Sequence, residues 1–172
     1  MEYVNECITV IETDALKILP LKYVKNYLRI DNDCDDGFLL NAVATAINYA
    51  QMITGKIFGT NTFKLNFTSD KALLKIDKTP ILIDEVLNIY VNNKKIEENN
   101  FKLKNGIIVF DKSISGEICV VFKAGIPIGQ ILADIKQAML YHVASIYQNK
   151  DGGRSVPKAA QEIYNLYRKV RL

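Results

Sequence analysis

Apolar positions near the start of the chain recur every three to four residues. Leu21, Val24 and Leu28 share this spacing in a short segment that opens after Pro20, a residue that the first turn of a helix accepts. The same spacing continues over a longer segment that stops at Gly55, and glycine is a typical residue at the end of a helix. The pattern therefore predicts a short helix followed by a long one.

The hydrophobic period changes to two between residues 61 and 125. The segment TFKLNFT alternates apolar with polar residues, as a half-buried strand does. The dipeptides Asn92-Asn93 and Asn105-Gly106 mark tight turns between strand-like runs, and a last run, EICVVFKAG, ends at Gly125. Short strands that are contiguous in sequence and joined by tight turns indicate an antiparallel sheet.

Helical spacing returns after Pro127, is interrupted by the segment DGGR, and resumes in a last helix that starts near Pro157. The sequence thus predicts an α+β fold in which residues 1–172 form a single domain. About four helices, from residues 20–57 and 127–172, form the helical core. A small antiparallel β-sheet, residues 61–125, is inserted between the second and third long helices.

Composition supports a globular chain with an uneven charge. Hydrophobic residues make up 49% of the sequence and charged residues 24%, an ordinary balance for a folded domain. Residues 1–60 carry 5 basic and 8 acidic groups, whereas residues 131–172 carry 7 basic and 3 acidic groups. Such asymmetry fits a solvated surface, head-to-tail self-association, or a basic tail that binds an acidic partner. The total of +3 does not by itself indicate nucleic-acid binding.

The cysteines and the first residues of the chain indicate in which cellular compartment we expect the protein. Cys7, Cys34 and Cys119 are far apart and form no paired motif, which argues against a zinc site or a disulfide scaffold and fits a reducing cytosol. Glu2 and Glu6 stand where a signal peptide carries positive charge. We therefore expect neither a signal peptide nor a transmembrane helix.

Four aspartates lie between residues 31 and 36, in the segment DNDCDD. Asp31, Asp33 and Asp35 match the first ligand positions of a calcium loop, but Asp36 replaces the required glycine and Ala42 the required last carboxylate. A carboxylate pair for acid–base catalysis needs partner residues that the sequence does not reveal. We therefore interpret the stretch as a helix entrance, in which Asp35 or Asp36 caps the long helix with its side chain.

The remaining candidates for chemistry are weak. His142 is the only histidine, and its place on an apolar helix face favours a buried or interface residue over a catalytic base. The segments GGR and GIPIG lack the other residues of a phosphate-binding loop. The basic residues of the last helix fit phosphate contacts, an amphipathic docking helix, or a solvated face.

The order of these pieces resembles the phage head–tail connector (head-completion adaptor) family of long-tailed double-stranded-DNA phages and prophages. The first part of the resemblance is a helix ending in LRID, an acidic loop, and a long helix closing with TG and a basic residue. The second is a strand ending in Ala-Gly, followed by a helix with a Gln-Ala pair and a Tyr-x-Asn ending. The matching positions are Leu28, Arg29, Ile30, Asp31, Thr54, Gly55, Ala124, Gly125, Gln137, Ala138, Tyr147 and Asn149.

The resemblance implies a structural protein of the virion head–tail junction, made in the bacterial host cytoplasm, with no cofactor, no metal and no membrane. Usually twelve copies form a ring on the portal, lengthen the conduit for double-stranded DNA and offer a platform for a stopper or tail-completion protein. The C-terminal helix typically reaches the portal, while the β-rich part faces the tail. Ile163, Tyr164, Tyr167 and Arg168 are therefore expected to carry the portal contact.

Two other functions remain open at this point. The N-terminal helices would suit a helix-turn-helix DNA-binding module, but the second helix has no Arg or Lys before Lys56 to read bases or phosphates. A small hydrolase or metal-dependent enzyme would rest only on the aspartates and His142.

Overall fold

The structure is a computed structural model that describes residues 7–69, 73–75, 85–104, 107–112, 114–149 and 156–168. The chain divides into two compact units. The β unit comprises Met1–Thr13 and Thr60–Gly125, and the helical unit comprises Asp14–Gly59 and Ile126–Leu172. The described residues form four α-helices and two antiparallel sheets, which confirms the predicted α+β class. Most of the main sheet lies between the second and third long helices, as expected.

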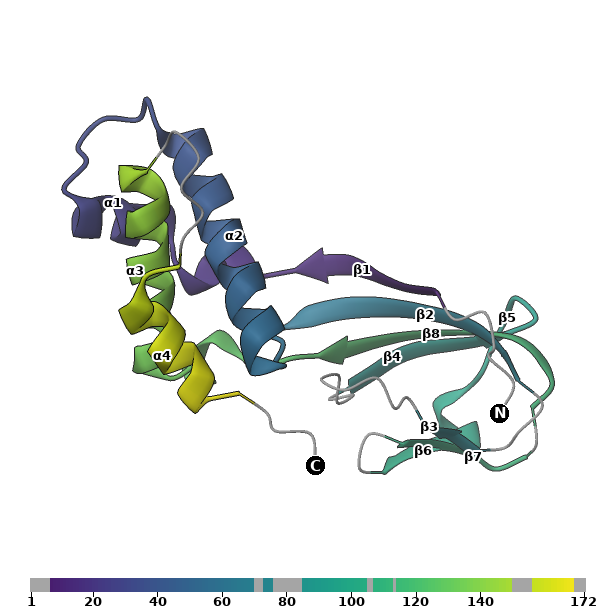
Figure 1. Cartoon of the computed structure of the whole chain (residues 1–172). Coiled ribbons are helices and arrows are strands. Elements are labelled where there is room, and N and C mark those ends of the chain that lie inside the picture. The colour runs from purple at the N-terminus through teal and green to yellow at the C-terminus, as the bar shows by residue number, and fades with distance from the viewer. Residues whose placement is uncertain are drawn as a thin grey trace. The chain divides into compact units, whose positions relative to one another are not determined.

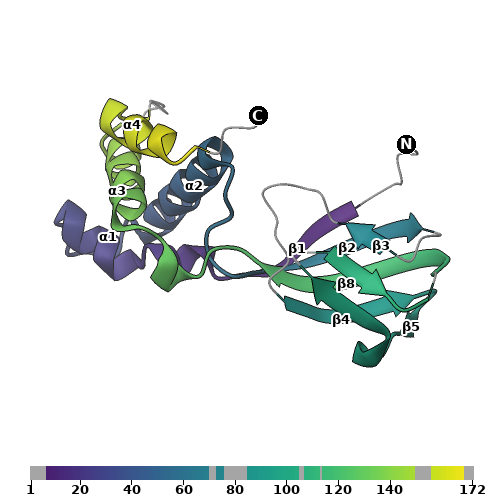
Figure 2. The ribbon, with the colours of Figure 1, turned by 90° about the horizontal axis from the view of Figure 1, so that it is seen from below.

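A five-stranded sheet dominates the β unit, with strand order β1-β2-β8-β4-β5 (Figures 1 and 2). Its strands are β1 (Cys7–Thr13), β2 (Asn61–Ser69), β8 (Gly116–Ala124), β4 (Glu85–Val91) and β5 (Lys94–Lys95). A smaller sheet has the order β3-β7-β6, with strands β3 (Leu73–Lys75), β7 (Ile107–Phe110) and β6 (Phe101–Lys104). A short 3-10 helix, η2 (Glu98–Asn100), precedes β6.

The alternation that predicted β2 does place its apolar side chains inside. Phe63, Leu65 and Phe67 are buried, while Lys64 between them is exposed. Phe63 pairs in register with Phe122 of β8, and their rings stack with centroids 5.6 Å apart. A stacked aromatic pair therefore joins β2 and β8, two inner strands of the main sheet.

The predicted turn at Asn92 and Asn93 is confirmed. Both residues have positive φ angles, 48° and 63°, as a two-residue turn between twisted strands requires. The Asn92 side chain also joins this turn to β8, because its Oδ1 accepts from the Glu117 N–H at 3.0 Å. A side chain at the neighbouring Gly116 would collide with Asn92, so glycine is required there. The predicted turn at Asn105-Gly106 lies outside the described residues, but the flanking strands β6 and β7 pair antiparallel.

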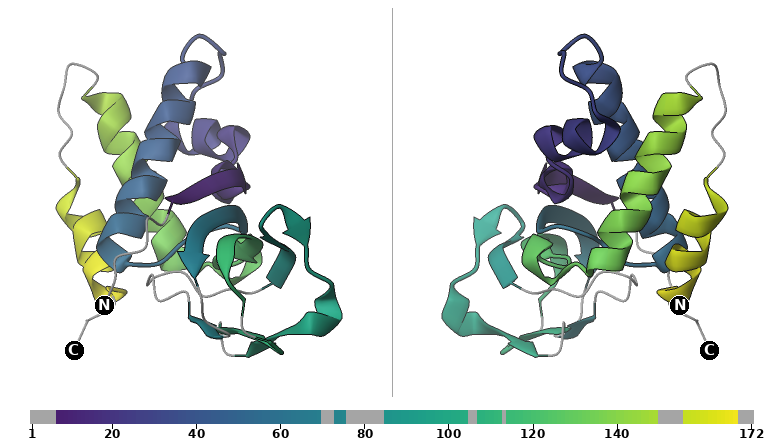
Figure 3. Two further views of the ribbon diagram at one scale, coloured as in Figure 1. Left: turned by 90° about the vertical axis from the view of Figure 1, so that its right-hand side faces the viewer. Right: turned by 90° about the vertical axis from the view of Figure 1, so that its left-hand side faces the viewer.

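The helical unit contains α1 (Leu21–Leu28), α2 (Asp36–Thr54), α3 (Ala133–Gln148) and α4 (Lys158–Leu166), together with the 3-10 helices η1 (Ala15–Ile18) and η3 (Ile128–Gln130). The helices α2, α3 and α4 lie side by side (Figure 3). Their apolar faces build one core with residues of η1 and α1. Gly55 ends α2 in the left-handed conformation, as predicted.

Two boundaries of the helical unit meet in space. The Gly59 N–H donates to the Ile126 carbonyl oxygen and the Ile126 N–H donates to the Ile57 carbonyl oxygen, both at 2.9 Å. Phe58, which forms a parallel bridge with Ile126, is buried in the helical core. The positions where the chain leaves and re-enters the helical unit are thus fixed beside each other.

Sequence reasoning missed β1 and did not single out the three-residue strand β3. The segment CITVIET forms β1 at the edge of the main sheet, so this sheet is not wholly an insertion between helices. All residues of β1 except Ile8 are exposed. The strand therefore lacks the alternation of apolar and polar side chains that is typical of a half-buried strand.

Pro20 lies one position before its predicted place in the first helical turn, because it is the N-cap residue of α1.

Candidate assembly surfaces

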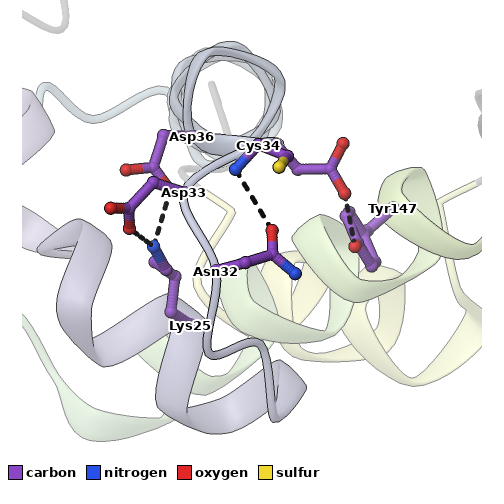
Figure 4. Close-up of polar contacts among 7 residues, drawn as sticks. Lys25, Asn32, Asp33, Cys34, Asp36 and Tyr147 are labelled. Carbon is purple, nitrogen blue, oxygen red and sulfur yellow. Dashed lines mark hydrogen bonds and ion pairs between the residues drawn. The ribbon is translucent and has the colours of Figure 1, made fainter.

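The acidic loop between α1 and α2 is organised by a lysine from α1. Lys25 Nζ donates to Asp36 Oδ1 at 2.8 Å and also contacts Asp33 Oδ1 (Figure 4). The hydrogen bond to Lys25 lowers the pKa of Asp33, and the bonds to both carboxylates raise the pKa of Lys25. The cation that this loop binds is therefore the ammonium group of Lys25.

Asp35 takes the predicted place at the N-cap of α2, but the predicted capping bond is wrong. No side-chain capping hydrogen bond forms there. Asp35 Oδ2 instead accepts from the Tyr147 hydroxyl of α3 at 2.7 Å, the bond drawn at Tyr147 in Figure 4. The Asp35 backbone carbonyl accepts from the Leu39 N–H. The loop thus ties the start of α2 to the end of α3.

This divergence of the aspartates argues against the calcium and catalytic interpretations. Asp33 and Asp36 point to Lys25, Asp35 binds Tyr147, and Asp31 is exposed. Within the described ranges, no three His, Cys, Asp or Glu side chains gather closely enough to hold a metal ion. Sequence reasoning found the helix entrance but not its partners, because nothing in the pattern linked residues 112 positions apart.

Arg29, at the centre of the LRID motif, ends α1 in an unusual conformation. Its φ and ψ angles are 57° and 47°, in the left-handed region that normally favours glycine. The Arg29 N–H donates to the Asn26 carbonyl and the Ile30 N–H donates to the Lys25 carbonyl, a pattern that satisfies the free carbonyls at a helix end. This turn directs the chain into the acidic loop.

Other motif positions also have packing or capping roles. Thr54 Oγ1 donates to the Ala50 carbonyl, and Asn149 caps α3 by donating from its backbone and side chain to the Ser145 carbonyl. Ala138 is fully buried, Leu28 and Ile30 pack on the core, and Gln137 is half-buried. At the end of β8 in the β unit, Ala124 is buried and Gly125 has a φ of 125°. Most of the matched residues therefore pack in the core or shape the ends of helices and strands, whereas Asp31 is exposed.

His142 is buried at 2% exposure, as its position predicted. Its ring meets the Tyr49 ring edge-on at 5.2 Å, and Tyr49 also contacts the ring of Tyr164 at 5.9 Å. His142 Nδ1 and the Tyr164 hydroxyl have no hydrogen-bond partner among the described residues. Burial lowers the pKa of His142 and raises that of Tyr164, so both groups stay neutral at pH 7.

The four residues expected to dock on a portal divide between core and surface. Tyr164 is fully buried in the helical core, and Ile163 is half-buried against it. Tyr167 is half-buried and donates from its hydroxyl to Asp134 Oδ2 at 3.1 Å, which raises the pKa of Tyr167. Arg168 is exposed. In this conformation Tyr164 cannot touch a partner, whereas Arg168 can.

Two further residues complete this end of the helical unit. Leu166 is 80% exposed, more than any other large hydrophobic residue in the described part of the chain. Lys56, which follows α2, holds its ammonium 5.5 Å from the centre of the Tyr167 ring. Leu166, Lys56 and Arg168 thus place an apolar side chain and two cations at the end of α4. Sequence reasoning had singled out Ile163, Tyr164, Tyr167 and Arg168 there, but neither Leu166 nor Lys56.

Residues of β1, β2, β4 and β8 line an open groove of about 820 Å³ in the β unit. Lys64 and Glu117 are its charged lining residues, and Tyr90, Cys119 and Val121 lie along it. None of the described helices is long and apolar enough to cross a bilayer. The exposed end of α4 and this groove of mixed polarity are thus two surfaces that a partner could contact.

Comparison with known proteins finds likeness at the level of the fold. The sequence matches no family model, and it matches no curated protein. The neck of an empty GTA particle computed with C6 symmetry and the neck of the native GTA particle computed with C12 symmetry each give a TM-score of 0.71 at 17% identity. Each covers 96% of this chain and 97% of the other chain.

The virion of the native gene transfer agent particle gives a TM-score of 0.69 at 19% identity, with 96% of both chains covered. At this level of identity the likeness establishes a shared fold. Because coverage is nearly complete in both directions, the shared fold includes both the helical unit and the β unit.

Proposed function

We propose that this chain is a structural subunit of the neck of a phage-like particle. Copies form a ring on the portal, extend the conduit for double-stranded DNA and present a docking platform to a stopper or tail-completion protein. The single observation that carries the proposal is the fold shared over 96% of the chain with neck proteins from structures computed with C6 and C12 symmetry. The order of motifs in the sequence points independently in the same direction.

The internal contacts and the exposed surfaces of the described residues suit a structural role. Its two most promising sites for chemistry, the acidic loop and the buried histidine, are occupied by internal contacts that hold helices together. The surface instead offers a helix end with an exposed leucine and arginine, and a sheet face with an open groove. Rings are built from unlike surfaces on one subunit, because one face of each copy meets a different face of the next copy.

Ring formation is tested by the mass of the assembly. The full chain, alone and mixed with a portal protein of the same phage or prophage, is analysed by size-exclusion chromatography with light scattering. We expect a ring-sized mass or a portal-bound ring in at least one condition. A chain that stays monomeric and does not bind the portal in either condition contradicts the proposal. Tight, sequence-dependent binding of duplex DNA at physiological salt would favour the alternative DNA-binding module.

We propose that α4 makes the portal contact through its exposed end. Deletion of residues 157–172 is a poor test, because it removes the buried Tyr164 and Ala160 from the helical core. The variants Leu166→Asp and Arg168→Glu change exposed side chains and leave that core intact. We expect each to weaken portal binding about tenfold or more, as is common for central interface residues. Unchanged binding by both variants would place the portal contact elsewhere.

A further inference from the structure

The exposed face of α2 carries no charge. Between Gly37 and Gly55 the sequence contains no Asp, Glu, Lys, Arg or His. The other three helices each carry charged residues beyond their first position, such as Lys22 in α1, Lys136 in α3 and Glu162 in α4. A helix face that remains in water usually carries charges, so the face of α2 is unusual.

The uncharged residues form a regular stripe. Phe38, Asn41, Thr45, Asn48 and Met52 follow one another at intervals of three and four residues, and all five are exposed. Intervals of three and four place side chains on one side of a helix. The stripe lies apart from the buried face of α2, which consists of Leu39, Ala42, Val43, Ala46, Ile47, Ala50 and Thr54. We call these five residues the α2 stripe.

The ends of the α2 stripe are apolar and its middle is polar. Met52 is 67% exposed and Phe38 is 36% exposed. Thr45 Oγ1 donates to the Asn41 carbonyl of its own helix at 2.9 Å, which leaves the amide side chains of Asn41 and Asn48 as the main polar groups of the stripe. Depletion of charge together with methionine and an aromatic residue is typical of the centre of a protein–protein interface.

We propose that the α2 stripe is the contact surface for a neighbouring copy of this chain in the ring. Nucleic acid is an unsuitable occupant, because phosphates are bound by cations and the stripe has none. A second copy is suitable, because uncharged amides can pair with its polar groups without burying an ion. The inference rests on the ring formation proposed above. In a closed ring the stripe meets a different surface of the next copy.

The size of the α2 stripe limits how strongly it binds. Fourteen residues separate Phe38 from Met52, which gives a length of about 21 Å at about 1.5 Å per residue. With a helix width of about 10 Å, the stripe covers roughly 200 Å², well below the roughly 800 Å² per partner of a stable interface. The α2 stripe therefore contributes to an interface that other contacts complete, and assembly is expected to be strongest on the portal.

The test introduces a charge into the middle of the stripe. Asn48→Arg and Thr45→Arg place an unpaired cation in the proposed contact, and arginine forms helices better than either original residue. Gln148→Arg is the matched control, since Gln148 is an exposed amide on α3. We expect the fraction of chain in portal-bound rings to fall about tenfold or more in the two stripe variants. The control should assemble like the wild type, and melting temperatures should be similar throughout.

A photo-crosslinking amino acid at position 48 gives a second test of the α2 stripe, and this test does not depend on the stability of the arginine variants. When the chain that carries this residue assembles into rings, we expect cross-links between two copies of the chain. Cross-links to the portal alone, or normal rings from both arginine variants, would overturn the assignment of the stripe. If the wild type forms no ring with or without the portal, the proposed function is wrong. The α2 stripe then has no neighbouring copy to bind, and its assignment is wrong as well.

Discussion

Arg29 shows how one residue can set the path of the chain. It adopts a conformation that glycine favours, and through it α1 ends and the acidic loop begins. Lys25, one turn earlier, can then reach Asp33 and Asp36. A left-handed backbone costs an ordinary residue about 1–2 kcal/mol, so the helix end contains a small, local strain.

Arg29→Gly is therefore expected to stabilise the protein. Relief of the left-handed strain should exceed the entropic cost of glycine, which is about 0.5–1 kcal/mol, and leave a net gain of about 0.5–1 kcal/mol. Urea unfolding measures the difference. As a control, Lys22→Gly within α1 should lower the free energy of unfolding by roughly 0.7 kcal/mol. A loss of stability in Arg29→Gly would mean that the arginine side chain makes contacts that outweigh the strain.

His142 makes the stability of the protein depend on pH. Its folded pKa lies below the ordinary value of 6.5 because burial disfavours the charged ring. Between the two pKa values the unfolded chain binds a proton that the folded chain does not, so stability falls as the pH drops below about 6.5. The fall continues until the pH reaches the folded pKa.

His142→Leu should remove this contribution. We expect the melting temperature of the wild type to fall more steeply than that of the variant between pH 8 and pH 5, because the other titrating groups are shared. The Nδ1 atom that the variant loses has no hydrogen-bond partner among the described residues, which keeps the cost at pH 8 small. Parallel curves for the two proteins would show that His142 is not protonated on unfolding in this range.

At the scale of elements, α4 is a short helix that docks through two buried side chains, Ala160 and Tyr164. Tyr164 is fully buried between α2 and α3 residues, and its ring packs against Tyr49. Nine residues are too few for a stable isolated helix. The docking of α4 on the helical core therefore holds its exposed end, with Leu166 and Arg168, in place.

Tyr164→Ala is expected to destabilise the protein by about 3–5 kcal/mol, the usual cost of removing a buried aromatic ring. Tyr164→Phe should change stability by less than about 1 kcal/mol, because the hydroxyl has no partner in the described part of the chain. Leu166→Ala, at an exposed position of the same helix, should stay within about 0.5 kcal/mol. Urea unfolding tests the three variants. Equal effects of Tyr164→Ala and Leu166→Ala would mean that α4 is not docked through Tyr164.

Periodicity predicted the elements that bury one face and failed for those that do not. The buried faces of α2 and β2 repeat at the expected spacing, and both elements were found. The edge strand β1 has no buried face and was missed. Contacts between distant residues could not be predicted either, since the bond between Tyr147 and Asp35 has no signature in the local sequence. The buried position of Tyr164 was likewise hidden, because a tyrosine on an amphipathic stripe suits a core or a docking surface.

On the scale of the whole molecule, the chain builds its helical unit from two separate segments. The residues that form the helical core all come from this unit. Hydrogen bonds join Ile57 and Gly59 to Ile126, so the ends of the intervening segment 60–125 are held side by side by the helical unit itself.

The helical unit should therefore fold alone. Residues 14–59, joined to residues 126–172 by a short Gly-Ser linker, are expected to unfold cooperatively and to retain a helical circular dichroism spectrum. The shorter linker also favours folding, since each halving of a loop saves about 0.6 kcal/mol of closure entropy. Phe58→Ala in the same protein is the control, and it should cost about 3–5 kcal/mol because Phe58 is buried beside the linker. Because the proposed portal contact lies on α4, the helical unit should also compete with the full chain for the portal, although it lacks the β unit, which the resemblance to the connector family leads us to expect on the tail side. A helical unit that folds but does not compete would move the portal contact to the β unit, and one that does not fold would show that the two units stabilise each other.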